Sequence, residues 1–229
     1  MTPYGLSHLV PLVVFACGLV GAVVVGRRHR TATGPTTFSR AWAVLVAAVG
    51  LFQAVALLVD FDLGVSLPLH LCRLTWIAVA VALWTHRPFP VALAFLWGGL
   101  LSTQAVLTPS LGEDFPDPRY LAFWALHLME VWAAVYLVVG LRLAPRWRDL
   151  AATVAATLVW AVCAMAFNAA AGTNYGYLRH KPAGSFLDLL GPWPWYVAAE
   201  IVVVSAVWAL MTLAARRWSR RSPDDRPVT

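Results

Sequence analysis

The residues of this sequence best suited to covalent chemistry are Cys72 and His127, each of which interrupts an apolar run. A thiol attacks only as its thiolate, and a nearby imidazole can lower its pKa and accept its proton. Glu130 follows His127 by three residues, so the two share a helix face and the carboxylate can orient the ring. These residue types predict a nucleophilic cysteine with a histidine base.

The stretch LPLHLCRLTW, residues 67–76, places His70 and Arg73 close to Cys72. Such polar residues are costly at membrane depth and mark functional positions there. His70 is a second possible base, but two residues along an ideal helix it points about 200° away from Cys72. Arg73 carries a planar guanidinium whose N–H groups can bind an anion in a fork, such as a lipid phosphate or an oxyanion.

Structural interpretations of the same residues stay open. Buried free cysteines are common and usually inert, and a transmembrane histidine often only bonds a neighbouring helix. Arg73 could pair with Glu130, Glu200 or Asp60 and hold helices together. Cys17 and Cys163 have only apolar neighbours in the sequence, and we assign them to packing.

Cofactor and metal chemistry fits the sequence poorly. A retinal protein needs a transmembrane lysine, whereas the single lysine, Lys181, lies in a loop. A haem between His70 and His127 would join residues whose depths differ by roughly 8 Å on the helical rise. His70, Cys72 and His127 could supply three zinc ligands, but we rank this reading low. We expect no cofactor and no metal.

The elements that must position these residues are membrane helices. The chain has 229 residues, of which 60% are hydrophobic and 12% charged, about half the charge of a soluble domain. Apolar runs of about 20 residues recur, each long enough to cross a bilayer. We predict an all-α seven-transmembrane-helix bundle, with helices near 6–25, 41–59, 68–85, 89–107, 120–141, 150–170 and 195–215.

Loop charges predict the orientation of this bundle. Connections after the first, third, fifth and seventh helices are basic, and those after the second and fourth are acidic. The positive-inside rule then puts the N-terminus outside and the C-terminus in the cytoplasm of a multi-pass cell-membrane protein. Residues 1–215 form one transmembrane domain, and we expect 216–229 to be a disordered basic tail. The net charge of +6 reflects this orientation rather than nucleic-acid binding.

The polar residues within the helices concentrate in the outer half of the predicted bundle, which indicates a polar cavity open outward. A second polar stretch, GTNYGYLRHKP from residue 172, belongs to the loop before the last helix. The residues that could support Cys72 and His127 are His70, Arg73, Gln104, Glu130, Asn168, Asn174, Tyr177, Arg179 and Glu200.

Four motifs carry a family resemblance: LPLHLC, FPDPRYLAFWALH, GTNYGYLRHKP and LLGPWPWY. With them the chain resembles the YwaF-type bacterial integral membrane proteins from its second predicted helix to its last. That family is similar to eukaryotic membrane proteins regarded as cysteine-dependent phospholipid acyltransferases. The resemblance implies an acyl-thioester intermediate on Cys72, with His127 as base.

The sequence thus favours a membrane enzyme that transfers or hydrolyses lipid acyl chains, with a membrane lipid as substrate or ligand. In it, Arg73 and the loop 174–181 would handle the lipid headgroup. The alternative is a transporter or a protein that binds a small solute in the polar outer cavity. A scaffold whose polar residues only join helices is a third reading. The sequence assigns no oligomeric state.

Overall fold

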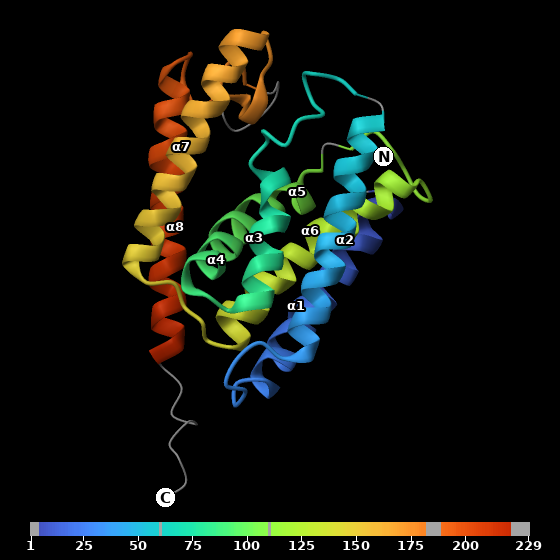
Figure 1. Ribbon diagram of the computed structural model, residues 1–229, viewed down its shortest axis with the longest axis vertical. Coiled ribbons are helices and arrows are strands. Elements are labelled where there is room, and N and C mark those ends of the chain that lie inside the picture. The colour runs from blue at the N-terminus through green and yellow to red at the C-terminus, as the bar shows by residue number, and fades with distance from the viewer. Residues whose placement is uncertain (1–4, 60, 110, 182–188, 221–229) are drawn as a thin grey trace, which may run out of the picture.

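The computed structural model describes residues 5–59, 61–109, 111–181 and 189–220, and over these residues the chain is helical. Figure 1 shows the helices running up and down around a central group. In chain order they are α1 (Leu6–Arg28), α2 (Thr37–Val59), α3 (Cys72–Thr85), α4 (Pro88–Leu93), η1 (Ala94–Ser102), α5 (Thr103–Leu107), α6 (Pro118–Val135), η2 (Tyr136–Gly140), α7 (Trp147–Ala171), η3 (Tyr175–Tyr177) and α8 (Trp195–Arg220).

The all-α class is confirmed. Six helices are long and apolar enough to cross a membrane, because α4, η1 and α5 join into one span, Pro88–Leu107, and α6 with η2 into another, Pro118–Gly140. The one predicted crossing that falls short of this length is the third, 68–85, because its helix, α3, has only 14 residues. At the other end of the chain, α8 continues to Arg220, so the helix reaches into the predicted tail. The rest of that tail, 221–229, lies outside the described residues.

The start of α3 differs from the prediction. We expected a helix from Pro68, but α3 begins at Cys72. The preceding backbone is held by distant aromatic side chains instead of helical bonds. The hydroxyl of Tyr175 accepts from the backbone N–H of Leu67 at 3.0 Å, and the indole of Trp160 donates to the Leu69 carbonyl at 3.0 Å. His70 therefore lies before the helix, and the argument that placed it 200° from Cys72 does not apply.

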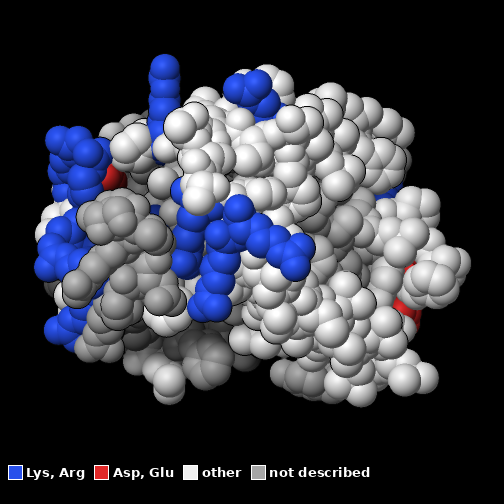
Figure 2. All heavy atoms as spheres, turned by 90° about the horizontal axis from the view of Figure 1, so that it is seen from below, with Lys and Arg blue, Asp and Glu red and all other residues white. Residues whose placement is uncertain are grey.

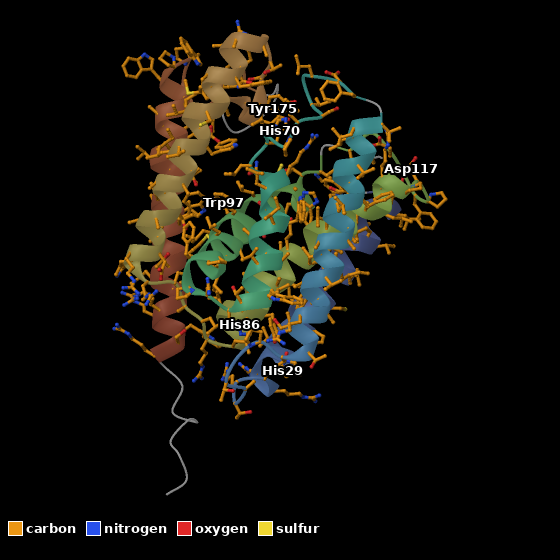
Figure 3. The ribbon with its side chains drawn as sticks, in the orientation of Figure 1. His29, His70, His86, Trp97, Asp117 and Tyr175 are labelled. Carbon is orange, nitrogen blue, oxygen red and sulfur yellow. The ribbon has the colours of Figure 1, made fainter. Side chains whose placement is uncertain are left out.

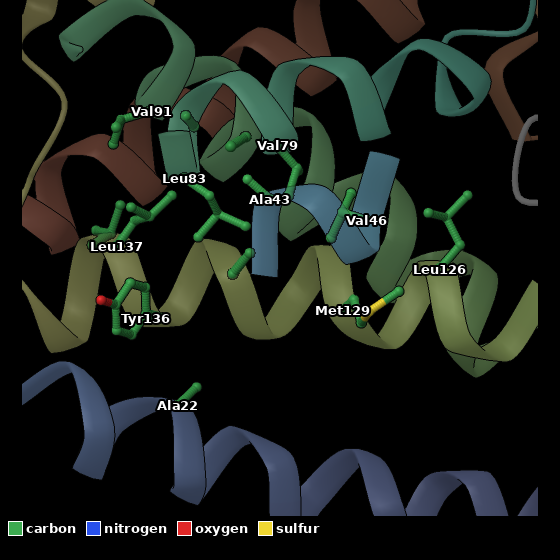
Figure 4. Packing of buried hydrophobic residues seen from close by; sticks show 14 of the residues in the cluster. Ala22, Ala43, Val46, Val79, Leu83, Val91, Leu126, Met129, Tyr136 and Leu137 are labelled. Atoms are coloured by element: carbon green, nitrogen blue, oxygen red, sulfur yellow. The ribbon is translucent and has the colours of Figure 1, made fainter. Parts of the chain in front are cut away.

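The centre of the molecule is α6 with η2, the most buried of the spans. Side chains of α2, α3, α4 and α1 pack around it in one apolar cluster, shown in Figure 4. Tyr136 and Leu137, both fully buried, lie in the middle of this cluster. On its α1 side the two backbones come close at Gly26, where an added Cβ would lie 2.5 Å from the Cα of Gly140.

Two stretches of these central spans, η1 and η2, are π-helices. Such wide turns are rare and frequently occur at functional sites. Side chains from α8 and from the turn after α1 donate hydrogen bonds to their carbonyls. The indole of Trp208 on α8 donates to Leu96 of η1 at 2.9 Å, and Arg30 donates to Gly140 of η2 at 2.6 Å.

The two ends of the bundle differ in charge. The end at which α1, α3, η2 and α8 finish, here called the basic end, carries most of the arginines. Figure 2 looks onto this end, where basic side chains far outnumber acidic ones. The opposite end, here called the loop end, holds the loops 61–71 and 172–181 and the segments 108–109 and 111–117 (Figure 1). The predicted grouping of the basic connections at one end is therefore present in the fold.

Candidate functional site

The two polar stretches singled out in the sequence, 67–76 and 172–181, meet at the loop end. The ring of His70 lies between those of Tyr175 and Tyr177, with centroids 5.1 and 5.8 Å away. The backbone N–H of Gly176 donates to Nδ1 of His70 at 3.3 Å. Figure 3 shows His70 and Tyr175 side by side above α3. Residues more than 100 positions apart thus form one polar cluster.

Asn168, at the end of α7, holds the second loop in place. Its Nδ2 donates to the Tyr175 carbonyl at 2.9 Å, and its Oδ1 accepts from the Tyr175 N–H at 2.7 Å and from the Thr173 hydroxyl at 2.8 Å. Asn174 holds the later part of this loop. Its Oδ1 accepts hydrogen bonds from the backbone N–H groups of Arg179 and His180 at 3.0 Å. Both asparagines, predicted as supporting site residues, shape the loop.

Cys72 and Arg73 open α3 directly beneath this cluster. Arg73 donates to the Val65 carbonyl and lies within electrostatic range of the Cys72 thiol and of Tyr175 and Tyr177. The thiol is half-buried, and it lies within electrostatic range of Glu130 as well as of Arg73. A thiol attacks only as its thiolate, so Cys72 needs a base to react.

Glu130 does not orient His127 as the sequence suggested. It is fully buried, its Oε2 accepts from the Ser102 hydroxyl at 2.5 Å, and its Oε1 has no hydrogen-bond partner among the described residues. His127 is held by its own helix, since the Phe123 carbonyl pairs with its Nδ1 at 2.8 Å. Sequence reasoning missed Ser102, although a serine in the apolar run of this span was a usable signal.

The two histidines are held in opposite tautomers. A carbonyl can only accept, so Nδ1 of His127 carries the proton and Nε2 is the basic nitrogen. At His70, Nδ1 accepts from the Gly176 N–H, so Nε2 carries the proton in the neutral ring. His127 is thus prepared as a base and His70 as a hydrogen-bond donor.

The helices that carry Cys72, Ser102 and His127 cross at Gly98 of η1. A Cβ added there would lie 3.5 Å from both the Glu130 carbonyl oxygen and the Thr75 methyl. Cys72, Ser102 and His127 each lie about one turn from this crossing, toward the loop end. Among the described residues, no hydrogen bond joins the Cys72 thiol to either imidazole.

Of the remaining predicted residues, Gln104 and Glu200 lie apart from the polar cluster, whereas Tyr177 and Arg179 are exposed members of its second loop. Gln104, on α5, is exposed, as are Tyr177 and Arg179, while Glu200 on α8 is half-buried beside Tyr196. Two hollows of about 390 and 350 Å³ are lined by α8 and by α2 with α6, respectively. Neither includes Cys72 or His127. Over the described residues, no group of three His, Cys, Asp or Glu side chains is arranged to hold a metal ion.

Comparison with known proteins identifies a family. The model of the TMEM164 family matches residues 3–212, nearly the whole length of the chain. An uncharacterised protein of Treponema pallidum (strain Nichols) is 28% identical over 169 residues, which cover 74% of this chain and 69% of that protein. No solved structure matches. Because the match spans all the helices described above except the last turns of α8, the chain is a polytopic membrane protein that belongs to the TMEM164 family.

Proposed function

We propose that this protein is a cell-membrane enzyme that transfers or hydrolyses acyl chains of membrane lipids, with Cys72 as nucleophile and His127 as base. The observation that supports this most directly is the tautomer of His127. Its Nδ1 is engaged by the Phe123 carbonyl, which leaves a basic Nε2 in the same layer of helices as a half-buried thiol. The resemblance of the sequence to cysteine-dependent acyltransferases points to the same chemistry.

The orientation is part of this proposal. At 1.5 Å per residue the 14 residues of α3 span about 21 Å, less than a bilayer core of ~30 Å. The folded loop 61–71 completes this crossing, which makes seven. With the N-terminus outside, the basic end then faces the cytoplasm, as the positive-inside rule requires. Cys72 lies in the outer half of the membrane.

The reaction has two steps. In the first, Nε2 of His127 takes the thiol proton, the sulfur of Cys72 attacks the ester carbonyl of a phospholipid, and the carbon–oxygen bond breaks. The departing lysophospholipid oxygen receives the proton from His127, which leaves a thioester on Cys72. In the second, His127 takes a proton from an acceptor hydroxyl or from water, whose oxygen attacks the thioester carbonyl. The carbon–sulfur bond then breaks, and the departing sulfur of Cys72 receives the proton back from His127. General base catalysis of this kind contributes typically 10²–10⁴-fold.

The polar cluster beside Cys72 suits the lipid headgroup. Arg73 provides a guanidinium, and His70 provides an Nε2–H donor because its Nδ1 is held by Gly176. The exposed Tyr177 and Arg179 stand on the same loop and can reach a phosphate at the membrane surface. An arginine fork pairs well with phosphate oxygens. Substrate thus approaches from the outer leaflet.

The test is to look for the intermediate. Purified protein in nanodiscs is supplied with a phospholipid and a lysophospholipid acceptor, and both acyl exchange and the mass of the intact protein are measured. We expect a hydroxylamine-sensitive acyl adduct on Cys72 that is lost in Cys72→Ser. Cys17→Ser and Cys163→Ser, which remove exposed thiols, serve as matched controls and keep full activity. Unchanged turnover in a folded Cys72→Ser protein refutes the mechanism.

A further inference from the structure

A hollow with a basic rim lies along α8 at the basic end, opposite the polar loops. Its volume is about 390 Å³, and it is lined by Leu210, Leu213, Ala214, Arg217 and Trp218. These positions recur every three or four residues, so they form one stripe along a helix face. The volume falls within the range of ligand pockets. The lining suits a molecule with an apolar body and one anionic group.

Arg217 is available to such a group. Its side chain is exposed, and within the described part of the chain no hydrogen bond or ion pair engages it. Other arginines of the basic end are already engaged. Arg30 donates to the carbonyls of Gly140 and Val139, and Arg146 pairs with Asp149 at 2.9 Å. A guanidinium at the rim of an apolar hollow therefore has no anionic partner within the described fold.

Trp218 forms a fixed wall of the hollow. Its indole N–H donates to the Val139 carbonyl of η2 at 3.3 Å, so the ring bridges α8 and the central helix, while 43% of the residue is exposed. Tryptophans in this situation sit at the level of the lipid headgroups. Arg217 at the same level of α8 thus lies where a lipid phosphate would be.

The surrounding charge favours an anionic lipid over a zwitterionic one. Arg216 and Arg220 flank Arg217 on α8, and Arg148, at the start of α7, is largely exposed. Figure 2 shows basic side chains spread over this face. Basic pockets beside transmembrane helices bind anionic headgroups, and one arginine in contact with such a headgroup is worth about a fivefold change in affinity.

We propose that this hollow binds one anionic glycerophospholipid of the adjacent leaflet. An acyl chain lies along Leu210, Leu213 and Ala214, and the phosphate binds Arg217 beside Trp218. A free phosphate would leave the apolar stripe unfilled, so the occupant is an intact lipid. The site is separate from Cys72 and does not depend on acyl transfer.

The test uses bromine quenching of tryptophan fluorescence. Full-length protein in nanodiscs is titrated with phosphatidylglycerol brominated on its acyl chains, and brominated phosphatidylcholine is the control lipid. We expect saturable quenching by phosphatidylglycerol, with a component that disappears in Trp218→Phe. Arg217→Gln weakens this binding about fivefold. The matched variant Arg220→Gln removes the same charge from the same helix end but outside the hollow, and it changes binding less than twofold.

A third variant removes the hollow without changing charge. Ala214→Phe fills the stripe without adding a tryptophan, and we expect it to abolish the saturable component, whereas Cys72→Ser leaves it intact. Size-exclusion profile and melting temperature show that each variant is folded. Equal weakening by Arg217→Gln and Arg220→Gln, or equal quenching by the two lipids, overturns the proposal, because either result reduces the binding to general attraction between a basic face and a membrane.

Discussion

The hydroxyl of Ser102 donates to Oε2 of Glu130 at 2.5 Å and joins η1 to α6 in the interior of the bundle. The other carboxyl oxygen has no hydrogen-bond partner among the described residues, and an unsatisfied buried oxygen is costly. Glutamine keeps an acceptor for Ser102 and carries no charge.

We therefore expect Glu130→Gln to change the free energy of unfolding by less than about 1 kcal/mol, whereas Glu130→Ala leaves the serine unpaired and a cavity and costs about 2–4 kcal/mol. Thermal unfolding in detergent measures both. Equal losses in the two variants would contradict this role of the pair.

The tautomers of the two histidines predict different effects on chemistry. His127→Gln removes the base, and acylation of Cys72 should fall about 10²–10⁴-fold. His70→Asn keeps an acceptor for the Gly176 N–H and leaves the base untouched, so it should retain the acylation rate constant and raise only the lipid concentration at half-maximal rate. Single-turnover labelling with an activated acyl ester measures both. If His70→Asn lost the same rate as His127→Gln, the assignment of base and donor would be reversed.

The basic end should be acid-sensitive because of His86, which lies between α3 and α4. Burial lowers its pKa from about 6.5 in the unfolded chain. The unfolded state therefore binds more protons as the pH falls below about 6.5, and stability falls with it until His86 is protonated in the folded state as well. Melting temperature against pH measures this slope, and His86→Asn should reduce it.

The link between α8 and η1 can be tested through Trp208. This residue is 1% exposed and donates to the Leu96 carbonyl at 2.9 Å. Trp208→Phe leaves that carbonyl unpaired and a void beside it, and we expect a loss of about 2–3 kcal/mol. Trp195→Phe, at a position 70% exposed on the same helix, should change stability by less than about 0.5 kcal/mol. Chemical unfolding followed by circular dichroism compares the two.

Because α1 packs closely on η2, substitution by alanine should affect stability very differently at two glycines of α1. At Gly26 an added Cβ would meet the backbone of Gly140 at 2.5 Å, whereas at Gly21 nothing lies within 4 Å. Gly26→Ala should therefore push the helices apart and cost about 1–3 kcal/mol, while Gly21→Ala should be neutral or stabilising because alanine favours helix. Melting temperatures of both variants measure the difference. A tolerated Gly26→Ala would contradict the observed approach.

Apolar periodicity and loop charge were enough to predict most of the fold. The predicted start of the last helix at residue 195 agrees with α8, and the predicted end of the second at 59 agrees with α2. The start of α3 was predicted wrongly because Pro68 suits the first turn of a helix, and only the fold reveals that Tyr175 and Trp160 hold the preceding backbone. A bond to a residue about 100 positions away leaves no local signal.

The fold brings some of the predicted site residues close together, but the contacts of Glu130 differ from those that helical spacing suggested. Segregation of polar residues toward one end singled out His70, Cys72, Glu130 and Asn168 before any contact was visible. Helical spacing suggested that Glu130 orients His127, yet the Phe123 carbonyl takes that role and Glu130 turns to Ser102. A three-residue spacing places Glu130 and His127 on one helix face. It does not show whether Glu130 bonds to a residue of its own helix or of a neighbouring one.

The π-helix η1 also has a consequence for register. Each residue of an α-helix turns the chain by about 100°, and a π-bulge accommodates an additional residue within a continuous helix. Everything after η1, from Thr103 onward, is therefore rotated relative to a regular continuation of α4. With one residue fewer between Ala94 and Ser102, the same span would still cross the membrane with the same composition, but Ser102 would face away from Glu130. The number of residues in η1 therefore decides which of its side chains face α6. A hydropathy profile does not reveal this number.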